Sequence, residues 1–207
     1  MSIHLRNTIM ILSGVYNYST DAVLWDDFLA GNQAAYACMY ERYAKLLYNY
    51  GYKIAQNRQL TEDCLQDLFL SILETRHRLS RTDSIKFYLM RSLRRDIVRR
   101  LQAEHRFDAD PDVLEFRVDF HYEPTWLDAQ ISADQSAALL RELNSLPPRQ
   151  KEALFLKYFD NLTYEEIAGV MGIEQSSAYK VIYKAIAALQ KRVDTGVLLL
   201  LLALPHP

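Results

Sequence analysis

Apolar residues recur along this chain at the spacing of an α-helix, and one segment shows that spacing in its strictest form. Five aliphatic residues follow one another at four-residue steps: Ile85, Leu89, Leu93, Ile97 and Leu101. Such steps place all five on one face of a helix. Six glycines and six prolines occur in 207 residues, so few helix breakers interrupt segments of this kind. The pattern predicts an all-α fold.

The first half of the chain is expected to hold four helices. One begins at Asp21 and ends near residue 31, and a long one spans residues 33 to about 56. The next is expected to begin at Thr61, a good N-cap, with Glu62 and Asp63 near the positive end of the helix dipole, and to run to about residue 74. The strictly periodic helix then extends from residue 83 or 84 to about 103.

The second half shows the order of elements found in a helix-turn-helix. One helix stops near Leu146, and Pro148 can open the next one. Thr163 and Glu166 are spaced as a capping box for a short helix over residues 164–171, which Gly172 ends. A last helix runs from about residue 175 to 193. A short capped helix, a tight turn and a second helix predict a helix-turn-helix.

The second helix of this pair leaves a polar face pointing outward. Its members are Gln175, Ser176, Ser177, Tyr179, Lys180, Tyr183 and Lys184. Hydroxyl, amide and ammonium groups suit base edges and phosphates in a DNA groove. An ordinary helical hairpin with a solvated face would show the same pattern, so this segment alone favours DNA binding without excluding the hairpin.

Charge is distributed unevenly, although the net charge is −2. Residues 76–100 hold nine basic and two acidic residues, whereas residues 104–128 hold eight acidic and two basic ones. This order predicts an anion-binding face followed by an acidic linker. The near-neutral total argues against a protein that coats nucleic acid.

We therefore predict two small helical domains joined by an acidic linker, the C-terminal one a helix-turn-helix. The expected parts are an N-terminal extension (1–20), a first domain (21–103), the linker (104–130), a second domain (131–195) and an apolar tail (196–207). The apolar run 197–204 is too short to span a bilayer. It either packs on the second domain or docks a regulator or a second copy of the chain.

Three segments resemble parts of the ECF subfamily of sigma-70 factors. The stretches LPPRQKEA (146–153) and YFDNLTYEEIA (158–168) resemble the promoter-recognition region. TEDCLQDLF (61–69) resembles the helix that binds the polymerase core, and FYLMRSLRRD (87–96) resembles the helix that melts DNA. The resemblance covers about residues 21–195 and includes the two-domain layout.

The resemblance implies a transcription initiation factor whose partners are RNA polymerase core and promoter DNA, with an anti-sigma factor as a further candidate partner. Asp63, Gln66, Asp67 and Phe69 would bind polymerase. Lys86, Arg91, Arg94, Arg95 and Arg99 would bind the minus-10 element, and the outward face of residues 175–184 the minus-35 element. The apolar runs of the chain are too short for a signal peptide or a membrane span, which predicts a cytoplasmic location without membrane insertion. No catalytic residue, metal or cofactor is predicted.

The chain departs from the common family pattern at three positions. Tyr179 stands where many members carry a basic residue, Val181 where many carry Arg, and Arg95 where many carry Asn. With its amide and serines at residues 175–177, the last helix is similar to a variant common in Bacteroidetes-type members.

Two other classes of function fit the sequence less well. A stand-alone, dimeric helix-turn-helix regulator would need symmetric half-sites and would leave the first domain without a role. An enzyme is disfavoured because the five histidines form no ligand-spaced cluster and no phosphate loop or nucleophile motif occurs. Cys38 and Cys64 are not spaced as a ligand pair, and both are expected to be buried thiols in a reducing compartment.

Overall fold

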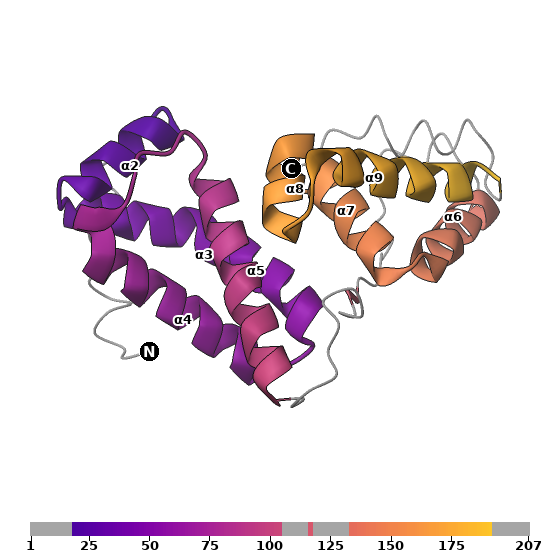
Figure 1. Ribbon diagram of the computed structural model, residues 1–207, viewed down its shortest axis with the longest axis horizontal. Coiled ribbons are helices and arrows are strands. Elements are labelled where there is room, and N and C mark those ends of the chain that lie inside the picture. Colours follow the sequence, from indigo (N-terminus) through magenta and orange to yellow (C-terminus); the bar gives the residue numbers. More distant parts are fainter. Residues whose placement is uncertain (1–17, 105–115, 118–132, 192–207) are drawn as a thin grey trace. The chain divides into compact units, whose positions relative to one another are not determined.

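The computed structural model describes residues 18–104, 116–117 and 133–191, and every regular element in these ranges is a helix. The all-α prediction is confirmed for them. The chain divides into two compact units, Met1–Asp108 and Ala109–Pro207, each drawn in Figure 1. The predicted N-terminal extension up to residue 17, most of the predicted linker and the predicted tail lie outside the described residues.

Helix α3 is the centre of the first unit. The helices of this unit are α2 (Asp21–Leu29), α3 (Gln33–Ala55), α4 (Arg58–Thr75), the 3-10 turn η2 (Arg76–Arg78) and α5 (Ile85–Glu104). Helix α3 contacts α2, α4 and α5, and α4 also contacts α5. Figure 1 shows α5 crossing α3 with α4 beside them. The predicted buried face of α5 is confirmed at four of its five positions, and Leu101 is half-buried.

Gly51 allows α4 and α5 to approach α3 closely. A Cβ atom at this position would lie 3.0 Å from Ile97 Cδ1 and 3.2 Å from both Leu93 Cδ2 and Thr61 Cγ2. All three distances are shorter than the ordinary contact distance between carbon atoms. The missing side chain therefore sets how tightly the three helices pack.

Helix α4 begins earlier than the sequence predicts. Asn57, not Thr61, is its N-cap: the Asn57 side chain accepts a hydrogen bond from Leu60 N–H at 3.1 Å. Thr61 lies within the helix, fully buried, and its hydroxyl donates to the Asn57 carbonyl at 2.8 Å. The Thr61 prediction was wrong because a threonine inside a helix can satisfy its hydroxyl on the carbonyl four residues back.

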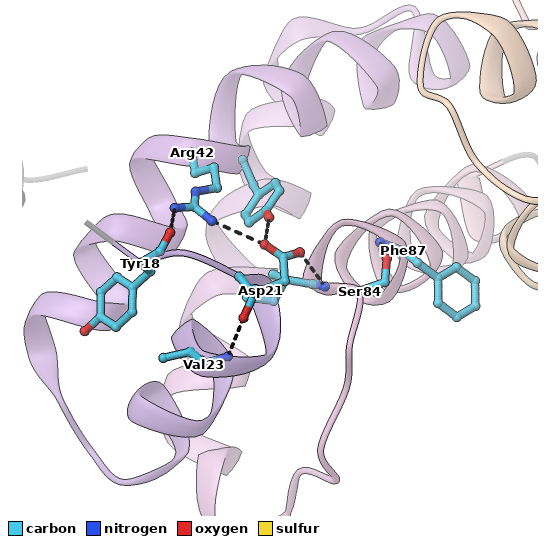
Figure 2. A network of polar contacts seen from close by, with 9 residues as sticks. Tyr18, Asp21, Val23, Arg42, Ser84 and Phe87 are labelled. Atoms are coloured by element: carbon cyan, nitrogen blue, oxygen red, sulfur yellow. Dashed lines mark hydrogen bonds and ion pairs between the residues drawn. The ribbon is translucent and has the colours of Figure 1, made fainter. Parts of the chain in front are cut away.

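The carboxylate of Asp21 joins three helices of the first unit (Figure 2). It accepts a hydrogen bond from Ile85 N–H at 3.0 Å, one from the hydroxyl of Tyr43, and one from the guanidinium of Arg42 at 3.3 Å. The first amides of a helix have no partner within it, so Asp21 at the start of α2 caps α5. Burial, and then the bond to Asp21, raise the pKa of Tyr43.

The second unit has the predicted helix order. Its helices are α6 (Ala133–Ser145), α7 (Pro148–Tyr158), α8 (Tyr164–Met171) and α9 (Gln175–Gln190). Helix α9 contacts α6, α7 and α8. The capping box is confirmed: Glu166 N–H donates to Thr163 Oγ1 at 3.2 Å, and Thr163 N–H donates to Glu166 Oε2 at 2.9 Å. Gly172 takes the predicted left-handed conformation, with φ of 67°.

Among the described ranges, none of the helices combines the length and the apolar character required to cross a membrane.

Replacing Asp21 with alanine should destabilise the first unit by about 3 kcal/mol. The change removes the cap of α5 and leaves the hydroxyl of the buried Tyr43 without its acceptor. Each buried polar group left without a hydrogen-bond partner costs about 1–3 kcal/mol. Denaturant unfolding can be followed by Trp25 fluorescence in a Trp126→Phe background, because these are the two tryptophans of the chain.

Asp26→Ala is the matched control for this change. Asp26 pairs with Arg81 at 3.2 Å, but their side chains are 46% and 83% exposed, so its loss should cost less than about 1 kcal/mol. Equal losses for the two variants would contradict the capping role of Asp21.

Thr163→Ala should loosen the start of α8 by about 1 kcal/mol, because the cap of the Glu166 amide is lost. Amide hydrogen exchange at Glu166 should become about fivefold faster. Thr163→Ser keeps a hydroxyl at the same place and should exchange at the original rate. If serine and alanine gave the same rate, the capping box would not hold the helix start.

Candidate nucleic-acid and protein interfaces

Helix α9 has one buried and one exposed face. Its buried residues are Ala178, Ile182, Ala185 and Leu189. Six of the seven residues predicted to point outward are exposed: Gln175, Ser176, Tyr179, Lys180, Tyr183 and Lys184. Ser177 is half-buried. The exposed fraction is 49% for Tyr179 and 74% for Tyr183, which is high for aromatic residues. Helix α9 thus offers a wide polar and aromatic surface.

One aromatic side chain of this surface is held by neighbouring helices. The ring of Tyr179 stacks on that of Tyr164 in α8, with centroids 3.9 Å apart and planes 19° apart. The ammonium of Lys157 in α7 lies 4.8 Å from the centroid of the Tyr164 ring and donates to the carbonyl of Leu162 at 3.4 Å. Stacking and cation–π contacts both favour this order.

Helix α5 presents arginines on the side opposite its buried stripe. Arg91, Arg95 and Arg99 are exposed, and their four-residue spacing aligns them along one line of the helix. Arg99 is 72% exposed and pairs with Asp96 at 3.1 Å. Lys86 and Arg94, the other two predicted minus-10 residues, are half-buried. The helix can therefore present three guanidinium groups to one anionic strand.

Helix α4 carries the residues predicted to bind polymerase, and they differ in how far they are exposed. Gln66 and Asp67 are exposed, whereas Asp63 is half-buried and accepts a hydrogen bond from Gln59 at 2.9 Å. Phe69 is only 2% exposed. The first three residues form a polar surface, and Phe69 supports that surface from within.

Aromatic rings of α3 enclose Phe69. Its ring centroid lies 4.9 Å from that of Tyr40 and 6.2 Å from that of Tyr36. The Tyr36 hydroxyl donates to the Phe69 carbonyl at 3.1 Å. Burial, with a smaller contribution from Tyr40, raises the pKa of Tyr36 to about 12. Tyr36 therefore stays neutral near pH 7 and keeps its proton for this bond.

Two sequence models match the chain, and both describe regions of one protein family. The model of Sigma-70 region 2 matches residues 39–107, and the model of Sigma-70, region 4 matches residues 136–189. Together they cover more than half of the chain. The chain belongs to the sigma-70 family.

Curated relatives of this sigma-70 family member are ECF RNA polymerase sigma factors. BldN of Streptomyces coelicolor is 26% identical over 166 residues, which are 78% of this chain and 61% of BldN. SigE of Mycolicibacterium smegmatis is 28% identical over 152 residues, which are 70% of this chain and 57% of SigE. The chain is thus of the ECF type, and it spans about three fifths of the length of these relatives.

A solved structure shares the fold. It is the structure of CnrH in complex with the cytosolic domain of CnrY, with a TM-score of 0.53 at 18% sequence identity. The alignment covers 83% of this chain and 95% of that chain.

The two matched regions of the sigma-70 family fall on the surfaces described above. Region 2 extends from within α3 through α4 and α5, and region 4 extends from within α6 to near the end of α9. The exposed faces of α4, α5 and α9 therefore all lie inside family regions.

Sequence reasoning gave no site role to Arg100, Lys157 or Tyr164. The guanidinium of Arg100 forms an ion pair with the carboxylate of Asp67, and this hydrogen bond raises the pKa of Arg100. These partners are 33 residues apart, so no local pattern could have indicated the contact. Tyr164 lies within the stretch that resembles the family, but its contact with Tyr179 depends on how α8 and α9 cross.

Within the described residues, no group of three or more His, Cys, Asp or Glu side chains is arranged to hold a metal ion. Cys64 is buried as predicted, and burial raises the pKa of its thiol, whereas Cys38 is only half-buried. The prediction for Cys38 was wrong because its side chain lies at the edge of the core.

Phe69→Ala should destabilise the first unit by about 3–5 kcal/mol, the usual cost of removing a buried phenyl ring. Gln66→Ala, three residues earlier on the exposed side, should change the free energy of unfolding by less than about 0.5 kcal/mol. Urea denaturation of the two variants measures the difference. An unchanged midpoint for Phe69→Ala would show that the ring is outside the core.

Proposed function

We propose that this chain acts as an ECF sigma factor, binding RNA polymerase core and directing it to promoters. The observation that carries the proposal is that a region 2 unit with an exposed arginine line and a region 4 helix-turn-helix with an exposed polar face occur in one chain. The ECF sigma factors BldN and SigE support it as relatives.

The surface on α4 is proposed to bind the polymerase core. Gln66 offers its amide to solvent, and next to it lies the carboxylate of Asp67, which is 60% exposed although it pairs with Arg100; Asp63 lies beside them. An acidic and amide surface suits a partner helix that carries basic residues, because complementary charges orient the two proteins as they meet. Phe69 is proposed to act indirectly, by holding this part of α4 against α3.

The arginine line on α5 is proposed to bind the separated strands of the minus-10 element. Arg91, Arg95 and Arg99 can neutralise phosphates, and their flat guanidinium groups can stack on unpaired bases. Lys86 and Arg94 on the same helix would add positive charge at the edges of this line.

The exposed face of α9 is proposed to enter the major groove of the minus-35 duplex, as the second helix of a helix-turn-helix does. Its amide and two serines at residues 175–177 support the finer proposal that the recognition helix is of the Bacteroidetes-like variant. Base-edge contacts from these side chains would set the sequence preference.

The working units are proposed to be residues 21–103 and 131–195, joined by the acidic stretch 104–130. Such a factor would work in the cytoplasm with RNA polymerase. An anti-sigma factor stays a predicted partner, which co-purification of the tagged full chain from its own host would identify.

The decisive experiment combines core binding with run-off transcription on genomic fragments. The full chain should be captured by RNA polymerase core and should start transcripts at defined positions. The double variant Gln66→Lys/Asp67→Lys should lose core binding, because it reverses the charge of the α4 surface. The triple variant Arg91→Gln/Arg95→Gln/Arg99→Gln should keep core binding and lose transcription.

Salt dependence provides a second measurement on the triple variant. Each phosphate contact to a single strand contributes about 0.7 to the slope of log affinity against log salt, so three lost contacts should reduce the slope by about 2. The free chain should bind duplex DNA weakly at physiological salt, because its net charge is −2. Failure to bind core polymerase, together with tight binding of the free chain to symmetric duplex sites, would contradict the proposal.

A further inference from the structure

Tyr179 is the one residue of the predicted DNA-facing set in the described second unit whose ring is stacked on a ring of another helix. It is 49% exposed, so roughly half of the side chain remains available to a ligand while one ring face lies against Tyr164. Tyr183, one turn later, is 74% exposed. The two tyrosines point away from the same helix but differ in how firmly they are held.

Tyr164 is itself held by its own helix start and by two neighbouring side chains. It follows Thr163, whose capping box fixes the first turn of α8. The Tyr179 ring stacks on the Tyr164 ring at 3.9 Å, and the ammonium of Lys157 lies over the same ring, 4.8 Å from its centroid. Lys157 is anchored in turn by its bond to the Leu162 carbonyl. Three helices thus contribute one ordered column: Lys157 from α7, Tyr164 from α8 and Tyr179 from α9.

A side chain ordered before binding loses little freedom when it binds, so more of its contact energy appears as affinity and selectivity. A tyrosine can donate or accept a hydrogen bond through its hydroxyl, and its ring edge can contact a thymine methyl group. Both kinds of contact are selective only if the ring is held in one orientation.

We propose that Lys157 and Tyr164 are positioning residues that fix Tyr179 as a reader of one base pair in the duplex bound by α9. This inference rests on the proposed function, because it takes the outward face of α9 as the DNA-binding face. The ligand is the major-groove edge of a base pair, and Tyr164 itself need not touch DNA.

The test measures base preference at each position of a randomised upstream element. In the first arm, the full chain with RNA polymerase core transcribes a promoter library, and transcripts are counted by sequencing. In the second arm, the full chain alone selects duplexes from the same library at low salt. The second arm keeps the inference testable when polymerase is absent.

Tyr179→Ala should reduce the preference at one or two adjacent base pairs by about tenfold, the usual effect of one lost base contact. Tyr164→Ala should reduce the preference at the same base pairs, and the double variant should lose no more than either single one. Tyr164→Phe keeps the stacked ring and should retain the original preference. Lys157→Gln removes the charge and should produce a smaller loss at the same positions.

Phe159→Ala is the matched control, since it removes an exposed aromatic ring that belongs neither to the column nor to the proposed DNA-binding face of α9. It should leave the preference at the Tyr179-dependent base pairs unchanged. A purely structural role for Tyr164 would lower the melting temperature of Tyr164→Ala and preserve its base preferences. Thermal unfolding of every variant, with Tyr164→Leu as a second apolar replacement, separates loss of folding from loss of reading.

Three results would overturn the inference: unaltered preferences in Tyr179→Ala, retained preferences in a folded Tyr164→Ala or Tyr164→Leu, and no base preference of the unaltered chain in either arm. Selective duplex binding without transcription would instead count against the proposed function. The inference would then stand or fall on the variants in the second arm.

Discussion

The burial of one line of α5 against α3 determines what the rest of that helix can do. Ile85, Leu89, Leu93 and Ile97 are fully buried, and burying each such side chain contributes about 1.5–3 kcal/mol. At 100° per residue, a position two residues after a buried one lies about 200° around the helix axis. Arg91, Arg95 and Arg99 stand two residues after Leu89, Leu93 and Ile97. Rotating the helix to hide them would therefore expose its whole apolar line.

Helix α9 follows the same rule with a different surface. Its apolar side contains small residues, Ala178 and Ala185, which let it approach α7 and α8. Gly172 reverses the chain at the end of α8 without steric cost, and Thr163 fixes where α8 begins. In both helices, burial of the apolar face determines which side chains face outward. The chemistry of each surface therefore depends on the packing of the core beneath it.

Local patterns in the sequence were enough to predict much of this fold. The four-residue steps of α5, the capping box at Thr163 and the turn at Gly172 each depend on residues within one or two helical turns. The start of α4 did not follow from such a pattern. Asn57 and Thr61 are both residues that favour an N-cap, and the packing of Thr61 beside Gly51, against α3, decides between them.

For the candidate surfaces too, the sequence predicts positions within one helix but not contacts between helices. Spacing alone places the outward residues of α9 and the arginines of α5. It could not show that Phe69 of α4 is enclosed by Tyr36 and Tyr40 of α3, since the pattern of one helix does not say which residues of another helix it meets. Nor could it show the pairing of Arg100 with Asp67 or the stacking of Tyr164 on Tyr179. Each of these contacts joins two helices, and the spacing of residues within a helix does not show how two helices cross.

The cap that Asp21 provides for α5 has a consequence for how the first unit is made. The carboxylate and the amide that it accepts are 64 residues apart. During synthesis the ribosome delivers Asp21 early, and its partner emerges only after α2, α3 and α4 have been translated. Closing so long a loop is entropically costly until the apolar contacts of α5 form with it. The first unit should therefore reach its native packing in one late step. In a nascent chain that ends before α5, the Asp21 carboxylate would still lack the Ile85 amide that donates to it.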